Sequence, residues 1–473
     1  MSTGKADSPQ PIATISQTLA QRVQGVGRRL SSVQVWKGVY GLDLPRRNVR
    51  YLEVEVFWAA FLSAAATFSA AFALRLGASN QEIGLLSSLP ALMALLITIP
   101  SGHFLSRRTQ VMPWLIRSLL LHRLGFLLVV LVPWLPFAAK GSALVWLLVL
   151  FTLPAHFFGV GWNSMLADAI PEVERTRVFA VRNGVSAIAL TGGIYLAGLW
   201  LEYGSFPWNY QILYGAGFVT SLLSIFYIRK LQIPDQLSTQ LETTLPLPDQ
   251  PRRSPRQHIA RWIRTADKFR GHADFMRIVL NTFLHGLGLW MVAPLYIIYF
   301  VRGLGANEGW LGLNGMLGNV TPVLGYYLWQ RAIERWGEKP ILKWTIVLVG
   351  VYPMLVGFSP SLAIILIWTG LNGLLVPAIG LSHFFMLLKI CPDRERPLFM
   401  GVYTTIMNMG AAVMPLVGVV AADRFGIVPV LVVGGILAVI GSASFLFNPL
   451  RTEDSLIVRR GQTDERELTS VAT

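Results

Sequence analysis

The sequence predicts an all-α integral membrane protein whose twelve transmembrane helices form two pseudo-symmetric six-helix bundles. Three observations support this prediction: an apolar composition, twelve apolar runs that each match one bilayer thickness, and an internal repeat. The repeat pairs LGASNQEIG at 76–84 with LGANEGWLG at 304–312, which is 228 residues further on. A membrane chain built from two like halves is typical of transporters that alternate access between their repeats.

Composition excludes a soluble domain. Of the 473 residues 53% are hydrophobic and 14% are charged, and the mean hydropathy is +0.53. Soluble domains carry about 25% charged residues. The apolar runs are long and continuous rather than alternating, so helices are favoured over a strand barrel.

The apolar runs give the expected elements in order. Spans one to six are expected at 52–74, 82–103, 111–135, 143–167, 178–201 and 210–228. Spans seven to twelve are expected at 276–301, 309–329, 341–358, 361–388, 398–421 and 427–447. The chain then divides into an N-terminal arm (1–50), a first half (51–230), a linker (231–273), a second half (274–448) and a tail (449–473).

The segments outside the spans carry no catalytic motif. In the arm, apolar residues recur at spacings of three and four with arginines between them, which indicates an amphipathic helix on the inner leaflet. Gly25 and Gly27 leave a disordered arm equally open. The linker is rich in Pro and Gln and then basic, and the tail is polar.

The net charge of +15 follows the predicted topology. Segments placed in the cytoplasm hold 35 of the 40 Lys and Arg, whereas the external loops hold only Arg75, Lys140, Arg302 and Arg424. This asymmetry is the positive-inside rule, and it predicts a multi-pass protein of the cytoplasmic (inner) cell membrane with both termini in the cytoplasm. The charge then attracts anionic lipid headgroups of the bilayer and indicates no nucleic-acid partner.

Targeting and cysteine content narrow the class further. The first 50 residues are polar and basic, so we expect no cleavable signal peptide. Cys391 is the single cysteine, which excludes an intrachain disulfide or a cysteine metal site. We expect no metal, no cofactor and no enzymatic activity.

Twelve spans, a central linker and a basic turn after the second span of each half resemble the major facilitator superfamily, over roughly residues 50–450. The family signature in this turn is G-x-L-A-D-R-x-G-R-R. The first copy, GHFLSRRTQ at 102–110, keeps Gly102 and Arg107 but has Ser106 at the Asp position. The second copy, QRAIERWGEK at 330–339, lacks the first Gly but keeps Glu334, Arg335 and Gly337.

These turns predict a cytoplasmic gate. An acid–base pair such as Glu334 and Arg335 can latch the two halves together in one state and release them in the other, which matters only if the contact differs between states. Interfacial anchoring is the alternative, and it stays open. A second echo, Pro171 to Arg175 and Pro392 to Arg396, places matching arginines after spans four and ten. The predicted gate residues are Gly102, Arg107, Arg108, Asp168, Arg175, Arg182, Glu334, Arg335, Gly337 and Arg396.

Ionisable residues at membrane depth are costly and therefore candidates for function. Arg123 lies roughly 18 Å into span three at the helical rise, with no carboxylate predicted at its own depth. It either supports the structure or binds an anionic part of a substrate. Glu55 is close enough to the inner end of span one to neutralise Arg117, which would make both residues structural; Asp168 is the nearest free acid for Arg107, Arg117 or Arg182.

The resemblance implies that spans one, four, seven and ten line a central cavity. His156 and His285 would then lie near mid-membrane, where an imidazole either carries a coupling proton or stays neutral and bonds a neighbouring helix. The asparagines at depth either join helices or contact substrate. The predicted cavity or coupling residues are Glu55, Arg123, His156, Asn163, His285, Asn314, Asn372 and Asn408.

We therefore expect a secondary active transporter, a monomer that moves a small or amphiphilic solute by alternating access, with a proton as the expected coupling ion and uniport as the alternative. A non-transporting receptor or assembly factor is a second class. A membrane-embedded lipid-modifying enzyme is a third, although it would need paired carboxylates or clustered histidines at one membrane face. Signatures of drug antiporters and sugar carriers are missing, so the substrate stays open.

Overall fold

The computed structural model describes residues 43–108, 110–136, 138–170, 172–232, 272–392 and 395–447. All regular secondary structure in these ranges is helical. The predicted amphipathic arm, nearly all of the linker and the tail lie outside the described residues.

The first half comprises α2 (Asp43–Thr67), α3 (Ser69–Arg75), α4 (Asn80–Ser106), α5 (Met112–Leu131), η1 (Val132–Trp134), α6 (Lys140–Ala169), α7 (Glu172–Tyr203) and α8 (Trp208–Ile228). The second half comprises α11 (Ala273–Ile298), η2 (Tyr299–Gly303), α12 (Glu308–Trp336), α13 (Glu338–Phe358), α14 (Leu362–Ile390), α15 (Arg396–Phe425) and α16 (Ile427–Phe447). With α2 and α3 counted as one span, and η2 as the end of α11, each half supplies six spans.

The first span differs from its expected range. It begins at Asp43 instead of residue 52, because three arginines before the apolar run are part of the same helix. It is also divided at Phe68, whose N–H donates to the Ala65 carbonyl three residues back. A separate short helix, α3, therefore forms the C-terminal end of this span.

In the described ranges, eleven helical segments are long and apolar enough to cross a membrane. The twelfth, α12, has 29 residues but is less apolar, because Asn314, Asn319 and several glycines interrupt its apolar positions. Glycines permit close helix approach, and α12 is one of the helices that contact the other half.

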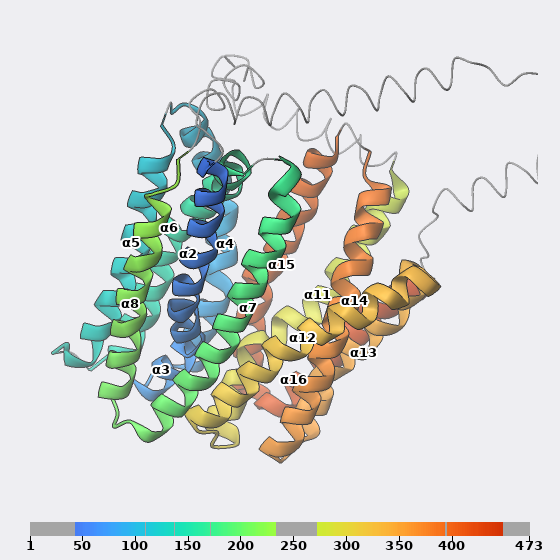
Figure 1. Cartoon of the computed structure of the whole chain (residues 1–473). Helices are drawn as coiled ribbons and strands as arrows, with labels where there is room; N and C mark the ends of the chain where they lie inside the picture. The colour runs from blue at the N-terminus through green and yellow to red at the C-terminus, as the bar shows by residue number, and fades with distance from the viewer. Residues whose placement is uncertain are drawn as a thin grey trace, which may run out of the picture.

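The two halves meet mainly through two helix pairs, α4 with α15 and α7 with α12, and α11 adds smaller contacts with α3 and α4. Figure 1 shows α7 and α12 adjacent at the bottom of the view and diverging toward the top. We call the end with the turns at 76–79 and 304–307 the turn end, and the opposite end, where the chain leaves α8 and enters α11, the linker end.

The buried apolar cores also differ between the turn end and the linker end. One core contains residues of both halves, and its members lie toward the turn end, for example Phe72, Ile194, Leu295 and Val419. The two other cores lie toward the linker end, and each belongs to a single half: one includes Leu52 and Leu115, and the other Phe275 and Leu342. Apolar burial, which is the main stabilising term, thus joins the halves at one end only.

The sequence repeat corresponds to two equivalent turns. Gly77 and Gly305 both adopt positive φ, at 87° and 65°, a conformation that glycine adopts without steric cost. Ser79 and Asn307 then cap α4 and α12 by accepting from backbone N–H groups three residues on. Both helices consequently start at the same register, Asn80 in one half and Glu308 in the other.

Candidate functional site

At the turn end the two halves are joined by a reciprocal set of contacts, which we call the clasp: Arg75, Asn80, Arg302 and Glu308. Arg75 Nε donates to Glu308 Oε1 at 2.8 Å, and its Nη2 donates to the Ala306 carbonyl at 3.4 Å. Arg302 donates from Nη1 to Asn80 Oδ1 and from Nη2 to the Ala78 carbonyl. Each arginine therefore binds the first helical residue and the turn carbonyl of the opposite half.

A second layer of polar contacts surrounds the clasp. Asn80 Nδ2 donates to Asp423 Oδ1 on α15, and Asn307 Nδ2 donates to Glu202 Oε1 on α7, each at 2.7 Å. Tyr210 on α8 donates its hydroxyl to Glu308 Oε1 at 3.1 Å. Among the described residues, every hydrogen bond between the halves lies in these two layers at the turn end.

Close packing accompanies the clasp. A Cβ on Gly198 of α7 would lie 2.6 Å from the Gly312 Cα on α12, which shows that these backbones nearly touch. At the equivalent place in the other helix pair, a Cβ on Gly84 of α4 would lie 3.0 Å from Val419 Cγ2 on α15. The repeated glycines at 84 and 312 thus both serve the interface between the halves.

The gate predicted from the sequence is a different one, at the basic turns of the linker end. In the sequence, Arg75 and Arg302 stand out only as exceptions to the positive-inside asymmetry. The available signal was the combination of the repeat with two arginines that are predicted to be external, each a few residues before a helix start.

Apart from Arg182, the predicted gate residues lie at the linker end, and the contacts described for them there are with residues of their own half. The Arg108 guanidinium lies over the Phe104 ring, 4.6 Å from its centroid, while Arg335 lies 5.7 Å from the Trp336 ring centroid. Glu334 accepts from Gln330 one turn back. Arg107 is exposed at the end of α4, and Gly102 has open space where a side chain would be.

Three further gate residues shape the turns themselves. Gly337 has φ 79° and separates α12 from α13. Arg175 Nε donates to the Ile170 carbonyl, and Arg396 Nη2 donates to the Leu388 carbonyl, so each arginine binds the end of the preceding helix. The second sequence echo therefore marks two equivalent turns. The side chain of Asp168 lies outside the described part of the structure.

Arg182 is the gate candidate that the structure moves to another site. It lies on α7, and its Nη2 binds Glu55 Oε1 of α2 at 2.8 Å. Glu55 is 2% exposed and also accepts from Ser224 of α8 at 3.0 Å, while the Trp162 ring lies 5.5 Å from the Arg182 guanidinium. The expected pairing of Glu55 with Arg117 is therefore wrong. Arg117 instead lies over Trp114.

Arg123 lies at the middle of its span, 11 residues from each end of Met112–Trp134. It is close enough to Glu55 for their charges to interact. Its Nε is buried and has no hydrogen-bond partner in the part of the chain that the structure describes. One carboxylate thus lies near two guanidiniums, which leaves a positive charge uncompensated by the described side chains of this region.

The two histidines occupy different surroundings. His285 Nδ1 contacts Ser442 Oγ at 2.8 Å and the Ala438 carbonyl at 3.2 Å, so this buried imidazole faces α16. His156 is half-buried on α6 and lies beside Pro90 of α4. A third histidine, His383 on α14, contacts Thr282 of α11 at 2.7 Å.

The predicted asparagines also differ in their surroundings. Asn314 Oδ1 accepts from Thr369 Oγ1 at 2.7 Å, which joins α12 to α14. Asn372, further along α14, has a buried Oδ1 without a hydrogen-bond partner among the described residues. Asn408 is half-buried on α15. Asn163 lies on α6, and its side chain is outside the described structure.

Two six-helix bundles that are related by an internal repeat and joined by hydrogen bonds at the turn end define the fold class of two-bundle membrane transporters. The family model described as Major Facilitator Superfamily matches residues 56–266 and 278–470. The chain belongs to this superfamily.

Solved structures show the same fold at low sequence identity. The chain is similar to a bacterial homolog of the human lysosomal transporter Spinster, inward-facing and occupied, with 11% identity, a TM-score of 0.63, and coverage of 85% of this chain and 97% of that one. It is similar to an inward-facing bacterial homologue of the iron transporter ferroportin, with 12% identity, a TM-score of 0.61, and coverage of 84% of this chain and 99% of that one. It is also similar to the nucleoside transporter NupG, with 13% identity, a TM-score of 0.58, and coverage of 84% of this chain and 98% of that one. No curated protein matches the sequence.

Proposed function

We propose that this protein is a secondary active transporter that moves a small or amphiphilic solute by alternating access, with the clasp as the gate on the external side. The observation that carries the proposal is the confinement of all described hydrogen bonds between the halves to the turn end. The charge asymmetry supports a cytoplasmic position for the linker end. The structure then corresponds to the state that is open to the cytoplasm.

Coupling to protons is assigned to Glu55 and Arg182. Three Asp, Glu, Lys or Arg residues lie eight or more residues from both ends of their span in the described chain: Glu55, Arg123 and Arg182. Glu55 is the carboxylate among them. Protonation of Glu55 would remove the charge that holds Arg182, and Arg182 lies on α7, which also carries Gly198 at the interface between the halves.

The linker-end turns complete the cycle. When the clasp opens, the turns with Arg107 and Arg108 in one half, and Glu334 and Arg335 in the other, are the parts that would meet. Among the described residues no hydrogen bond or ion pair joins these two turns in the present state, so a latch between them would differ between states, as a gating contact must.

A reversible cross-link tests the proposal. Asn80→Cys with Asp423→Cys, joined by a cleavable thiol cross-linker, should stop transport until the linker is cleaved. The matched control is Glu338→Cys with Lys389→Cys, a contacting pair within one half, which should leave transport intact. Burial raises the pKa of the native Cys391 thiol, so its background reaction is slow. Undiminished transport in the Asn80–Asp423 cross-linked protein would refute alternating access through this gate.

The transported solute for this assay comes from an untargeted comparison of metabolites and drug sensitivity between cells with and without the protein. Cysteines at His156 or Asn372 should then be reachable from both sides of the membrane, in different states. Reactivity from one side under all conditions would contradict the proposal.

A further inference from the structure

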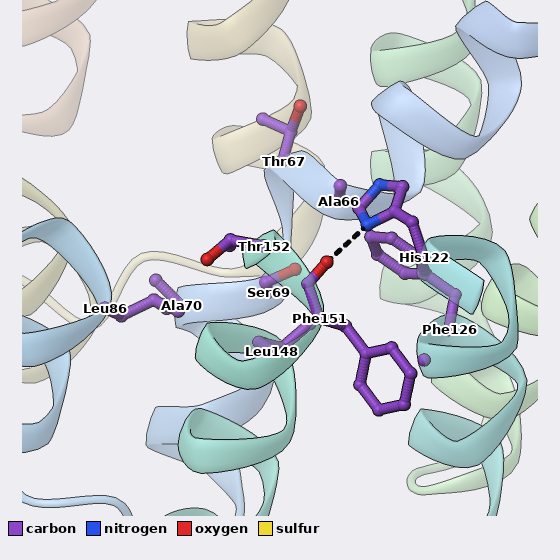
Figure 2. A pocket seen from close by; sticks show the side chains of 11 residues that line it. Ala66, Thr67, Ser69, Ala70, Leu86, His122, Phe126, Leu148, Phe151 and Thr152 are labelled. Carbon is purple, nitrogen blue, oxygen red and sulfur yellow. Dashed lines mark hydrogen bonds between the residues drawn. The ribbon is translucent and has the colours of Figure 1, made fainter. Parts of the chain in front are cut away.

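A pocket of about 250 Å³ lies within the first half, between α2, α3, α4, α5 and α6. Figure 2 shows Thr67, Ala70, Leu86 and Thr152 around this space, with the His122 ring on its wall. An engineered cavity of about 150 Å³ is large enough for benzene, so this pocket can hold a one- or two-ring group.

The pocket presents a mostly apolar surface even though hydroxyl residues line it. Thr67 Oγ1 donates to the Ser63 carbonyl at 3.1 Å, and Thr152 Oγ1 donates to the Val149 carbonyl at 2.6 Å. Ser69 shares a hydrogen bond with Tyr214. Because the hydroxyl groups are engaged with the protein, methyl groups and the Phe, Leu and Ala side chains dominate the wall.

His122 is the exception. Its Nδ1 lies 2.8 Å from the Phe151 carbonyl oxygen, which can only accept, so Nδ1 carries the hydrogen. The bilayer favours the neutral imidazole, and the Nε2 of a neutral ring with hydrogen on Nδ1 is an acceptor. No protein donor to Nε2 is present among the described residues.

We infer that this pocket binds a ring-sized apolar group that carries one hydrogen-bond donor, with His122 Nε2 as the acceptor. The inference rests on the proposed function, because it makes this group the apolar part of the transported solute. The position supports it. Ser69 and Ala70 of α3 line the pocket, and the last residue of the same seven-residue helix is Arg75 of the clasp.

Indole and 1-methylindole test the acceptor, because they have the same ring system and only indole has an N–H donor. Binding of radiolabelled indole to the purified full-length protein should be displaced by unlabelled indole about fivefold more effectively than by 1-methylindole, the value of one hydrogen bond. His122→Phe should remove this preference. Equal displacement by the two compounds in the wild-type protein would overturn the role of His122.

A pair of tryptophan substitutions on α6 tests the location independently of His122. Leu148 lines the pocket, whereas Leu150 is 58% exposed on the outside of the bundle. Leu148→Trp should abolish indole binding, and Leu150→Trp should leave it unchanged. Indole binding that survives Leu148→Trp, or no saturable binding to the wild-type protein, would overturn the pocket assignment.

These binding measurements do not depend on transport. Indole binding at this site without alternating access would refute the proposed function but not the binding site. Alternating access with indole bound elsewhere would refute the binding site but not the proposed function.

Discussion

Arg75 and Arg302 make the same pair of contacts in opposite directions across the interface. Each donates to the side chain of the first helical residue of the other half, Glu308 or Asn80, and to the equivalent turn carbonyl, Ala306 or Ala78. The accepting groups follow the sequence repeat, since Asn80 and Ala78 lie 228 residues before Glu308 and Ala306, whereas the two arginines are 227 residues apart. A contact that is repeated by the pseudo-two-fold axis is expected to close and open as a unit.

Removal of one arm of the clasp should favour the externally open state. The Arg75 side chain is 39% exposed, so its ion pair with Glu308 contributes at most about 1 kcal/mol. Arg75→Gln should therefore raise the externally open population by up to about fivefold. External labelling of a cysteine at position 372 measures this population. The charge-reversed pair, Arg75→Glu with Glu308→Arg, should restore the wild-type rate of external labelling. If Arg75→Gln does not raise the labelling rate and the reversed pair does not restore it, the ion pair has no gating role.

Asn80 is predicted to require an amide. Its Oδ1 accepts from Arg302 while its Nδ2 donates to Asp423, and only a group with both an acceptor and a donor satisfies both partners. Asn80→Asp places two carboxylates side by side and should weaken closure of the turn end. Addition of Asp423→Asn should recover it. Labelling rates that do not differ between the single and the double variant would contradict this role.

Closure of the turn end is predicted to require the close approach of Gly198 to Gly312. Gly198→Ala forces the α7 and α12 backbones apart, and overpacking of this kind costs about 1–3 kcal/mol. The variant should populate the externally open state. Gly192→Ala on the same helix, where nothing lies within 4 Å, is the control. If the two variants behave alike, the close approach is not required.

The Glu55–Arg182 pair should be coupled in stability. Loss of one partner leaves a buried charge unpaired and costs about 3–5 kcal/mol, so Glu55→Gln and Arg182→Gln should each lower the melting temperature. The double variant should be more stable than either single one. If the pair also carries the coupling proton, Glu55→Gln should abolish transport driven by a proton gradient but retain solute exchange, and a loss of both would indicate a structural role.

Arg123 can be assigned by one substitution. Arg123→Gln removes the guanidinium whose Nε has no hydrogen-bond partner among the described residues and keeps a polar side chain. If Arg123 binds an anionic part of the solute, transport should fall by at least tenfold while expression stays normal, the loss of about 1.4 kcal/mol of binding. Unchanged transport at normal expression would assign Arg123 to structure.

The spans were predictable because bilayer thickness fixes the length of an apolar helix. Their ends were not. The charged residues from Asp43 to Arg50 continue the first helix, and the division at Phe68 has no Pro or Gly to announce it. The partner of Glu55 could not be found either, because Arg182 lies 127 residues away on a helix whose rotation is set by packing.

The clasp illustrates the same limit. Asn80 and Glu308 have the composition of ordinary first-turn residues, and their role depends on how two complete bundles dock. The repeat did show that both turns have equivalent conformations. It could not show that each turn would be the binding partner of the other.

The equivalent turns at the turn end follow helices of different construction in the two halves. At the turn end, the first span finishes in α3, a separate helix about 10 Å long, whereas the counterpart helix α11 runs unbroken to Ile298 and ends in the π-helical turn η2. One side of the interface can pivot at Phe68 without moving the inner part of its helix, and the other side is tied to a long rod. The opening stroke is therefore expected to be unequal: a local swing in the first half and a rigid-body tilt in the second.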